Sequence, residues 1–407
     1  VTIYPEAFIT TSGNGRIIFN KRVNVLGSSQ VFDGQAQIQF GEGCIGTLNV
    51  GWFGARGYDR EDDTKAFQKV LGIASGLSNS VNVFVPIGKY MIAEQLLLEN
   101  TTPLNKSINL LGEGMSRSTN DGSSIIWNGN PGASMILVRN NYHNLIQSLD
   151  FAAEPGREVK NNIELRPQVY LMEFRDCSFS GSAGEGSANI NLNEGNSIQV
   201  SEVSFRNCVF RGKTTDNRTW MTTSAIKGGK ANTKNFYFEK CSFLGYNEAA
   251  INIEISDIVN VSNCAFALNQ IDIVCLLCGM QATSNYSEQS RSFFKGTNSD
   301  NLAFTTLINN FFDGHPIEDY VIINGSGSLV MLNNNFGGNG GGDSTNLIRW
   351  DSRNISSIFS VGNFFRNTST STSPIILTGR DADNHDIIKS FLDKIGKDGA
   401  TSKKHIN

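Results

Sequence analysis

The sequence predicts an all-β protein that folds as a single-stranded, right-handed parallel β-helix, which is a solenoid of stacked coils. The first observation is a phrase, repeated down the second half of the chain, in which cysteine or asparagine stands two residues before phenylalanine. The second is that glycine turns follow the copies and that no segment with helical periodicity separates them. The third is that 26 aromatic residues are phenylalanine, against 9 tyrosines and 4 tryptophans. The copies begin at Cys177, Cys208, Cys241, Cys264, Asn310, Asn334 and Asn363, with an earlier degenerate copy at Leu149.

Successive copies lie 31, 33, 23, 46, 24 and 29 residues apart. A repeat of roughly 20–30 residues that carries one strand at a fixed place is typical of a solenoid, whose coils stack about 4.8 Å apart. The interval of 46 residues then covers two coils, with a degenerate copy at Ser292-Phe293-Phe294. An antiparallel sandwich is the alternative fold, but it does not require the same residue class at the same point of every strand.

We expect the repeated cysteines and asparagines to form a ladder inside the coils or at a turn. Each terminal phenylalanine would stack on the phenylalanine of the next coil, in a dry core that offers a tyrosine hydroxyl no partner. Buried free thiols fit the four repeated cysteines better than disulfides, since asparagine replaces them later. Cys275 and Cys278 form a C-x-x-C motif in an apolar strand without a second pair nearby, so we predict no metal site there.

The composition gives no basis for several classes of partner. The net charge of the 407 residues is −4 and 18% of them are charged, so we expect no nucleic-acid partner and no basic membrane patch. No apolar run approaches the roughly 18 residues of a transmembrane helix. The sequence begins at Val1 without a basic, apolar leader, so we expect a processed or trimmed product.

Three segments are expected along the chain. Residues 1–50 consist of short alternating runs separated by glycine-rich turns, which indicates a small β cap or the first irregular coils. Residues 51–380 would form the parallel β-helix, because a solenoid grows without a second core. Residues 381–407 would form a short amphipathic helix around residues 387–395, followed by a polar tail.

A capping helix is expected near residues 62–74, with Asp62 or Asp63 as its N-cap. An open β-helix would expose its first apolar coil, and a helix laid across that end would block edge-to-edge pairing. The residues that recur at helical spacing are Phe67, Val70, Leu71 and Ala74.

The residues around this helix carry a resemblance to a known family. Gly54-Ala55-Arg56-Gly57, then Asp62-Asp63-Thr64, then Val85-Pro86-Ile87-Gly88-Lys89-Tyr90 resembles the opening of the pectate-lyase-like superfamily of β-helix proteins, which includes phage tailspikes and polysaccharide depolymerases. Tyr58 and Arg60 depart from the small or acidic residues usual between these motifs. The resemblance implies the fold but leaves the chemistry open, because the superfamily holds lyases, hydrolases, a fructan-cleaving transferase group and non-catalytic binders.

A second strand in each coil supplies the candidate site. Alignment on the phenylalanine anchors places 163–166 over 190–193, then 226–229, 251–254 and 271–273. Period-2 alternation turns the isoleucines inward and the residues between them outward. A solvated strand shows polar residues without any function, and this reading stays open for each residue. The outward column contains Glu164, Arg166, Asn191, Asn193, Lys227, Asn252, Glu254 and Asp272, with Glu248 at the preceding turn.

Two carboxyl groups in this column favour hydrolysis of a glycosidic bond, which needs one protonated and one ionised carboxyl about 5–9.5 Å apart. We therefore expect Glu254 and Asp272 to be catalytic, with Glu248 as a further acid. A lyase is the alternative, with Lys227 or Arg166 opposite a uronate and with Ca²⁺ as its cation; a hydrolase would need no cofactor. Asn191, Asn193, Asn252, Glu164 and Arg166 would line the substrate site.

Trp220 follows an inserted stretch, residues 213–219, that lengthens its coil to 33 residues. Such an insertion is typical of a loop over a binding surface, and an exposed tryptophan there could stack on a sugar ring. We expect Trp127 and Trp350 to pack inside instead.

These observations predict an extracellular enzyme that degrades a polysaccharide in a groove outside the β-helix. The resemblance implies a homotrimer, either secreted or carried in a phage virion tail. Besides a glycoside hydrolase and a polysaccharide lyase, a transferase of the same fold and a non-catalytic glycan-binding adhesin remain open.

Overall fold

The computed structural model describes residues 1–11, 15–33, 37–101, 106–115, 121–166, 168–192, 200–214, 219–228, 235–298, 304–313, 320–325, 327–337, 348–351, 355–365, 375–378, 388–391 and 394–395. Within these ranges, the structure holds no helix long and apolar enough to span a membrane. The chain divides into two compact units, Val1–Val209 and Phe210–Asn407.

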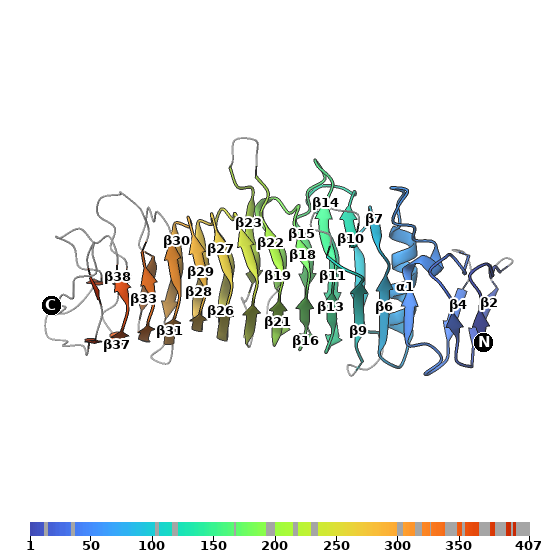
Figure 1. The fold of residues 1–407 in the computed structure, drawn as a ribbon. Coiled ribbons are helices and arrows are strands. Elements are labelled where there is room, and N and C mark those ends of the chain that lie inside the picture. The colour runs from blue at the N-terminus through green and yellow to red at the C-terminus, as the bar shows by residue number, and fades with distance from the viewer. Residues whose placement is uncertain are drawn as a thin grey trace. The chain divides into compact units, whose positions relative to one another are not determined.

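The first unit is built from parallel strand pairs, which Figure 1 shows side by side in successive coils. One series of strands is β5 (Thr47–Asn49), β6 (Val81–Val85), β8 (Leu96–Glu99), β9 (Ile108–Gly112), β11 (Ser134–Arg139), β13 (Leu145–Gln147), β15 (Asn161–Leu165), β17 (Glu173–Arg175), β19 (Gly184–Leu192) and β21 (Val203–Arg206). The second series is β7 (Gly88–Ile92), β10 (Ser123–Trp127), β14 (Asp150–Ala153) and β18 (Ser178–Phe179). A short third series is β12 (Asn141–Tyr142), β16 (Val169–Tyr170) and β20 (Val200–Ser201).

The second unit repeats two of these series, again with parallel pairing. The longer series is β23 (Thr222–Gly228), β24 (Phe236–Glu239), β26 (Ala249–Ser262), β28 (Ile271–Thr283), β30 (Ser292–Asn298), β31 (Phe304–Ile308), β33 (Val321–Gly325), β34 (Gly327–Leu332), β36 (Ile348–Asp351), β37 (Ile355–Val361), β39 (Ile375–Thr378) and β40 (Ile388–Phe391). The shorter series is β22 (Val209–Arg211), β25 (Ser242–Leu244), β27 (Ala265–Ala267), β29 (Tyr286–Glu288), β32 (Phe311–Asp313), β35 (Asn335–Phe336), β38 (Phe364–Phe365) and β41 (Lys394–Ile395). An all-β chain with long parallel ladders is therefore confirmed, as a parallel β-helix requires.

The first 50 residues contain short strands, as predicted. β1 (Thr2–Ile3) pairs in parallel with β3 (Asn24–Val25), and β2 (Arg16–Phe19) pairs in parallel with β4 (Gln37–Phe40), each pair as a sheet of its own. The assignment of this segment to a small β cap or to the first irregular coils stays a prediction.

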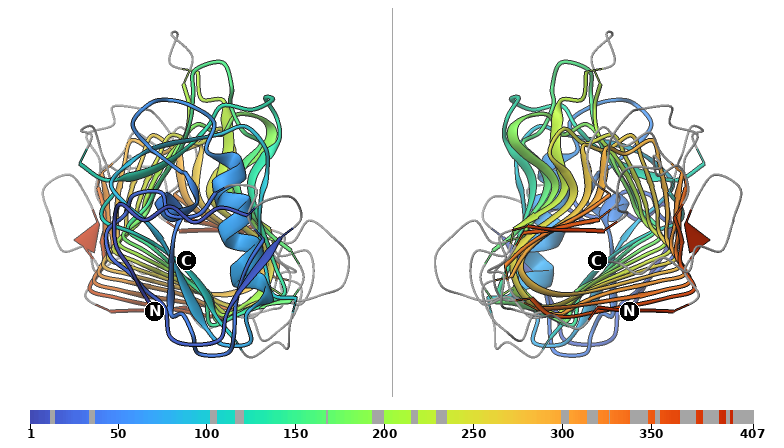
Figure 2. Two further views of the ribbon diagram at one scale, coloured as in Figure 1. Left: turned by 90° about the vertical axis from the view of Figure 1, so that its right-hand side faces the viewer. Right: turned by 90° about the vertical axis from the view of Figure 1, so that its left-hand side faces the viewer.

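The predicted helix is α1 (Thr64–Gly76), which follows the 3₁₀ turn η1 (Val50–Phe53). Its four periodic apolar residues, Phe67 to Ala74, are all buried, and α1 contacts η1, β5, β6 and β8. The left view of Figure 2, taken from the N-terminal side, shows α1 in front of the strands that follow it in the first unit. The Lys106 ammonium donates to the carbonyls of Ala74, Ser75 and Leu77, so a buried cation satisfies the last carbonyls of the helix. Its role as a cap over the first coil stays a prediction.

Asp62 and Asp63, the two aspartates before α1, accept different backbone hydrogen bonds. Asp62 accepts the backbone N–H of Thr64, the first residue of the helix, at 3.0 Å, whereas Asp63 is the N-cap by position and makes no side-chain capping hydrogen bond. The Asp63 carboxylate instead accepts the backbone N–H groups of Arg56 at 2.9 Å and Gly57 at 3.4 Å. The Thr64 hydroxyl accepts the N–H of Ala93 at 2.8 Å, just beyond β7. The Asp-Asp-Thr motif therefore ties the loop before the helix to the helix and to the sheet.

The predicted cysteine–asparagine ladder is present. In the second unit the backbone N–H of each ladder residue donates to the side-chain oxygen of the ladder residue one coil later: Cys264 to Asn285 at 2.8 Å, Asn285 to Asn310 at 3.0 Å, Asn310 to Asn334 at 2.9 Å and Asn334 to Asn363 at 2.9 Å. Each amide also donates back to a main-chain carbonyl of the coil before, as Asn310 does to Ala282 at 2.9 Å. All seven cysteines are buried free thiols.

A left-handed residue precedes each ladder position, and the sequence pattern did not reveal it. The φ angles are 54° at Asn263, 56° at Ser284, 54° at Asn309 and 53° at Asn333. Asparagine tolerates this conformation better than other residues with a side chain. The asparagine before the ladder residue in several copies is therefore a turn residue rather than part of the core.

The phenylalanines stack from coil to coil, as predicted. Phe151 and Phe179 stack in the first unit at 5.1 Å between ring centroids. In the second unit Phe243 stacks on Phe210 and on Phe266, at 4.9 Å each. This column makes the interior dry on one side of each coil.

The degenerate copy predicted at Ser292-Phe293-Phe294 is wrong, because the missing copy begins at Asn285. Asn285 occupies the ladder, and Ser287 pairs with Phe266 and Phe312 in the place of a phenylalanine. Phe293 comes from β30 and fills the space, with ring centroids 6.0 Å from Phe266 and 4.5 Å from Phe312.

Ser287 donates a hydrogen bond to the buried carboxyl of Asp272. The prediction that Asp272 points outward is therefore wrong. The Asp272 side chain has no exposed area, and its carboxyl accepts the Ser287 hydroxyl at 2.5 Å and the Asn269 amide at 2.8 Å. Burial raises the pKa of Asp272 to about 7, against the lowering effect of hydrogen bonds from Ser287, Ser290 and Asn269. The cause of the error is register: Ile251 pairs with Ile273, not Ile271, so Asp272 lies at the corner before the outward column.

The predicted C-terminal helix is also wrong where the structure describes it. Ile388–Phe391 and Lys394–Ile395 form β40 and β41, which pair in parallel with β37 and β38. Ile358 pairs with Ile388 and Phe365 with Ile395, so both strands follow at the 30-residue spacing of a further coil. An unpaired strand edge favours this continuation over a short isolated helix, which is marginal in water. The polar tail predicted beyond residue 396 lies outside the described residues.

Substitution of Asn310 tests the ladder. Asn310→Ala leaves the Asn285 N–H and the Ala282 carbonyl buried without partners, so we expect the free energy of unfolding to fall by about 3 kcal/mol or more. Asn310→Cys should cost less, because cysteine serves at the same position in Cys264. Urea unfolding measures both, with Asn260→Ala on the outer face as the control; a loss below about 1 kcal/mol for Asn310→Ala would contradict the ladder's role.

Asp272 should make stability depend on pH. Its folded pKa of about 7 lies above the unfolded value of 3.8, so its contribution to stability is fully present below pH 3.8 and is lost as the pH rises to about 7. The loss is on the order of 4 kcal/mol, at about 1.4 kcal/mol per pKa unit. Unfolding at several pH values should show Asp272→Asn becoming more stable relative to wild type as the pH rises. Asp257→Asn, an exposed acid of β26, should run parallel to wild type; parallel behaviour of Asp272→Asn would refute the assignment.

Candidate functional site

The candidate site lies on the outer face of β23 and β26 in the second unit. Ile226 pairs with Ile251 as predicted, which sets Lys227 beside Asn252 on the neighbouring strand. Ile251 and Ile253 are fully buried, so the residues that alternate with them, Asn252 and Glu254, lie on the outer face. The same register brings Val274, not an acid, beside Asn252 on β28.

Glu248 is the acid that the structure joins to this face. It is exposed and lies at the turn before β26, held by its backbone N–H to the carbonyl of Thr223 at 3.2 Å. The Asn252 side-chain amide donates to the Glu248 carboxylate at 3.0 Å. Glu248 is therefore joined to Asn252, which is paired in register with Lys227.

Glu254 is half-buried and follows Asn252 by two residues on the same face of β26. Two residues of an extended strand span about 6.6 Å. Asn252 thus stands between two carboxyl groups, one reaching it from the turn and one next along the strand. The pair formed by Glu248 and Glu254 replaces the predicted pair of Glu254 and Asp272, because Asp272 faces the interior.

Trp220 lies at the base of the inserted stretch, where it forms an antiparallel bridge with Thr214. Its carbonyl accepts the amide of Asn247 at 3.2 Å, so the base of the insertion is tied to the residue before Glu248. A side chain on Gly245, whose φ is 76°, would overlap the indole ring. Trp220 therefore packs on the backbone beside the acids, half-buried, rather than standing free.

Asn247 is a residue of this cluster that the sequence did not single out. Its amide connects Trp220 to the turn, and its backbone N–H donates to Thr222 at 3.1 Å. The one sequence feature that could have pointed to Asn247 is its position directly before Glu248.

The remaining predicted residues lie in the first unit. Glu164 pairs in register with Asn191, and its carboxylate accepts the Arg166 guanidinium at 2.7 Å. That ion pair leaves the Glu164 side chain 13% exposed and the Arg166 side chain 53% exposed. Asn191 is 1% exposed, and neither polar atom of its side chain has a hydrogen-bond partner. Asn193 lies outside the described residues.

The remaining predictions concern Trp127, Trp350 and the pair formed by Cys275 and Cys278. Trp127 is buried, with its indole N–H donated to the carbonyl of Asn130 at 3.1 Å. Cys275 and Cys278 are buried within β28, and the described residues hold no group of three or more metal-ligating side chains. The side chain of Trp350 lies outside the described residues.

The outer face of β23 and β26 therefore presents two carboxyl groups, an amide and an ammonium group within one coil-to-coil step. Carboxyl groups can give and take protons, and the amide and ammonium can hold hydroxyl or carboxylate oxygens of a bound molecule.

Several solved structures are similar to the chain, each at low identity. A protein of Geobacillus virus E2 is 13% identical with a TM-score of 0.41, over 85% of this chain and 62% of that one. The A-module of an Azotobacter vinelandii mannuronan C-5 epimerase is 13% identical with a TM-score of 0.47, over 86% and 95%. The tailspike of Acinetobacter baumannii bacteriophage Fri1, a capsular polysaccharide depolymerase, is 14% identical with a TM-score of 0.44, over 85% and 56%.

The chain thus spans less than two thirds of the length of both viral proteins. No protein of curated function matches it in sequence. A family model does, and its match runs from β5 through β29, which includes the motifs around α1, the ladder cysteines and the candidate site. Since the model of the rhamnogalacturonase A/epimerase, pectate lyase-like family matches residues 47–289, more than half of the chain, the protein belongs to that family.

Proposed function

We propose that the protein hydrolyses glycosidic bonds of an extracellular polysaccharide on the outer face of β23 and β26. The observation that carries the proposal is the hydrogen bond between Asn252 and Glu248, with Glu254 two residues further along the same face. Membership in a polysaccharide-acting β-helix family supports the substrate class. The proposal extends, on the resemblance of the sequence motifs alone, to an extracellular location, secreted or on a virion, and to assembly as a homotrimer.

The two carboxyl groups take different roles. Glu248 accepts the Asn252 amide and is exposed, so it acts as the carboxylate that activates water or attacks the sugar. Glu254, half-buried beside β28, acts as the acid that protonates the leaving oxygen. An inverting hydrolase would need these two carboxyl groups roughly 6.5–9.5 Å apart, and a retaining one about 5–5.5 Å apart.

The neighbouring groups position the sugar chain. Lys227, beside Asn252, would hold hydroxyl or carboxylate oxygens, and Trp220 would border the substrate. In the first unit, contact of Glu164 and Arg166 with a substrate stays a prediction, and Asn191 is too deeply buried to reach one. None of these roles requires a cofactor.

A lyase is the second candidate, and the register of Lys227 beside Asn252 favours it. In this reaction an amine takes the proton α to a uronate carboxylate, while a cation such as Ca²⁺ neutralises that carboxylate. Arg166 suits the base role less well, because it is paired with Glu164.

Conservative substitution of the acids tests the proposal. Glu248→Gln and Glu254→Gln keep the shape of the site but remove the proton transfer, so each should lower turnover by about 10²–10⁴-fold. The double variant should be little worse than either single one, because the two groups act as a unit. Glu288→Gln, an exposed acid of β29, is the matched control and should keep full turnover.

The products separate the classes of activity. Neutral and acidic polysaccharides are digested while reducing ends and the ultraviolet absorbance of unsaturated uronates are followed. A hydrolase gives reducing ends alone, a lyase gives both signals, and an adhesin binds and gives neither. Normal turnover in both acid variants, together with its loss in Lys227→Ala, would replace the hydrolase with the lyase.

A further inference from the structure

One outward-facing surface of the second unit is largely apolar. It lies on both sides of the turn that carries the ladder, in the four coils whose ladder residues are Asn285, Asn310, Asn334 and Asn363. We call it the corner surface. Its first flank is the outer face of β28, β31, β34 and β37 just before the turn, and its second flank is the outer face of β29, β32, β35 and β38 just after it.

The first flank becomes aliphatic along the solenoid. Strand register aligns the residues two positions before each ladder residue, which are Thr283, Ile308, Leu332 and Val361. Each is half-buried and follows a buried residue of its strand, so these side chains point outward. Three of the four are apolar, although a solvated strand usually places polar residues on its outer face.

The second flank is aromatic. Strand register aligns the residues one position after each ladder residue, which are Tyr286, Phe311, Asn335 and Phe364. Tyr286 is 38% exposed and Phe311 is 39% exposed, and their rings stack at 5.7 Å between centroids. The next residue, Phe312, already fills the core of its coil, so the core does not require the ring of Phe311.

The same turn is charged in other coils. In the first unit Glu173 pairs with Arg175 at 2.8 Å and with Arg206 at 3.5 Å on the strands before the turn. At the start of the second unit Glu239 and Lys240 lie just before Cys241. In the four coils of the corner surface, the residues from two before the ladder residue to one after it carry no charge. The charges that would keep this turn in water are therefore replaced by apolar groups, which indicates a covered surface.

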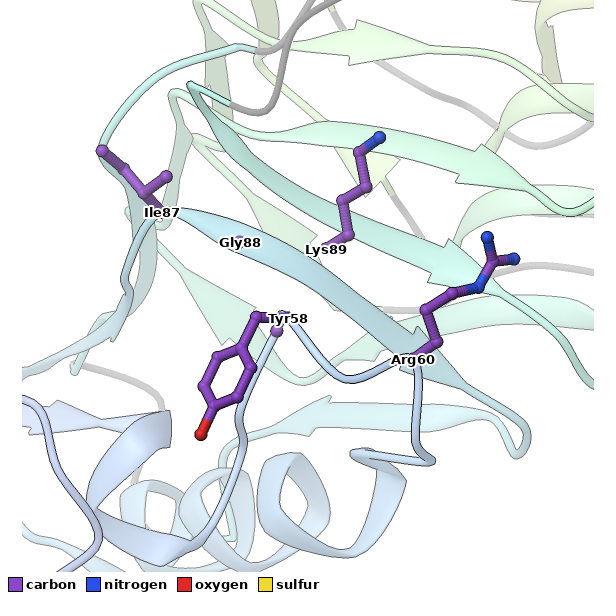
Figure 3. A pocket seen from close by; sticks show the side chains of 6 residues that line it. Tyr58, Arg60, Ile87, Gly88 and Lys89 are labelled. Atoms are coloured by element: carbon purple, nitrogen blue, oxygen red, sulfur yellow. The ribbon is translucent and has the colours of Figure 1, made fainter.

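A pocket of the first unit shows the contrast with ordinary exposed apolar residues. Tyr58 and Ile87 line it together with Arg60 and Lys89, and Figure 3 shows the tyrosine and isoleucine side chains lying apart. Single apolar side chains among charged ones are common on protein surfaces and need no partner. The corner surface differs, because its aliphatic and aromatic side chains are neighbours on adjacent strands.

We propose that the corner surface joins copies of this chain in a closed ring of three, around an axis parallel to the solenoid. A two-fold contact places one patch against itself, whereas a ring places one patch against a different patch of the next copy. A turn with two unlike flanks in the same coils offers two such patches. The aliphatic flank of one copy then packs on the aromatic flank of the next. The inference rests on the homotrimer included in the proposed function and locates its interface.

The border of the corner surface is complementary in the coils of Asn285 and Asn310. Three residues after the ladder residue, the second flank carries Glu288 in one coil and Asp313 in the next. Four residues before the ladder residue, the first flank carries Gln281 and Thr306, whose side chains can donate hydrogen bonds. In a parallel ring each coil meets the same coil of the next copy, so each carboxylate of one copy faces a donor of its neighbour.

The complementarity continues where the acid is absent. In the coil of Asn334 the residue three positions after the ladder residue is Gly337, and the residue four positions before it is Val330. Neither donor nor carboxylate is present there, so apolar side chains meet a backbone without charge. Phe359, which pairs with Val330 in the next coil, is 39% exposed and extends the aliphatic flank. Polar groups on the two flanks therefore change together.

Charge substitutions on the two flanks test the ring. Ile308→Lys and Phe311→Glu each bury an unpaired charge in every contact, so each should weaken assembly of the full chain about 100-fold or more. The double variant Ile308→Lys/Phe311→Glu sets the lysine of one copy against the glutamate of the next and should restore assembly. Ile308→Lys/Phe311→Lys sets like charges together and should stay monomeric. Sedimentation velocity measures each mass, and the wild type should have three times the mass of one chain.

Leu277→Lys, which adds the same charge at an exposed leucine of β28 outside the corner surface, is the control and should keep the ring. Circular dichroism should show the wild-type fold in every variant. A wild-type chain that sediments as one or two copies would overturn the proposal. So would single variants that keep the ring, an opposite-charge double variant that does not recover it, or its loss in Leu277→Lys. Glu248→Gln should lose turnover and keep the ring, so failure of the ring and failure of the proposed cleavage can be told apart.

Discussion

The ladder of side-chain amides is the interaction on which the second unit depends. Each coil turns at a left-handed residue, and the next residue buries a backbone N–H that no strand can satisfy. The asparagine of the next coil satisfies two backbone groups of this coil. Its side-chain oxygen accepts the buried N–H, and its side-chain amide donates to a carbonyl. Cysteine does it more weakly, with Cys264 sulfur accepting the Cys241 N–H at 3.4 Å. A buried polar ladder therefore sets the register that the phenylalanine column alone would leave free to slip.

The same register decides which side chains reach the outer face. Once Ile226 pairs with Ile251, Lys227 must stand beside Asn252, and the turn before β26 must carry Glu248 toward the same place. Inside–outside alternation does not hold where the chain bends between two strands, because there consecutive residues can both face the interior. Asp272 and Phe293 occupy such corners, and both are buried. Asp272 and Phe293 are each the second residue of a strand, so a candidate acid is safer in the middle of a strand than near its start.

Much of the fold was predictable, because a solenoid repeats one solution and the sequence repeats with it. The repeated cysteines and phenylalanines predicted the coils, and the helical spacing of the apolar residues from Phe67 to Ala74 predicted α1. The failures came where one coil differs from its neighbours. The copy at Asn285 carries Ser287 where other copies carry phenylalanine, so the repeat pattern does not predict it, and the pairing of Ile251 with Ile273 is likewise not fixed by the pattern. At the C-terminal end, Ile388 to Ile395 match both a helical spacing and a further coil, and only strand pairing separates the two. The candidate site was predictable in its residue types, but Glu248 could be joined to Asn252 only by the turn geometry.

Residues that depart from the repeat therefore mark either a functional feature or a local adjustment of packing. The serine at 287 breaks the phenylalanine column, and its position is explained by the buried carboxyl of Asp272 and by Phe293, which fills the vacated space. No comparable internal reason exists for Tyr58, which departs from the family motif and is 82% exposed. An unexplained break in the core would cost stability, whereas an exposed aromatic costs nothing in the core. That asymmetry separates the two exceptions: the first is an internal repair of packing, and the second has no part in the core.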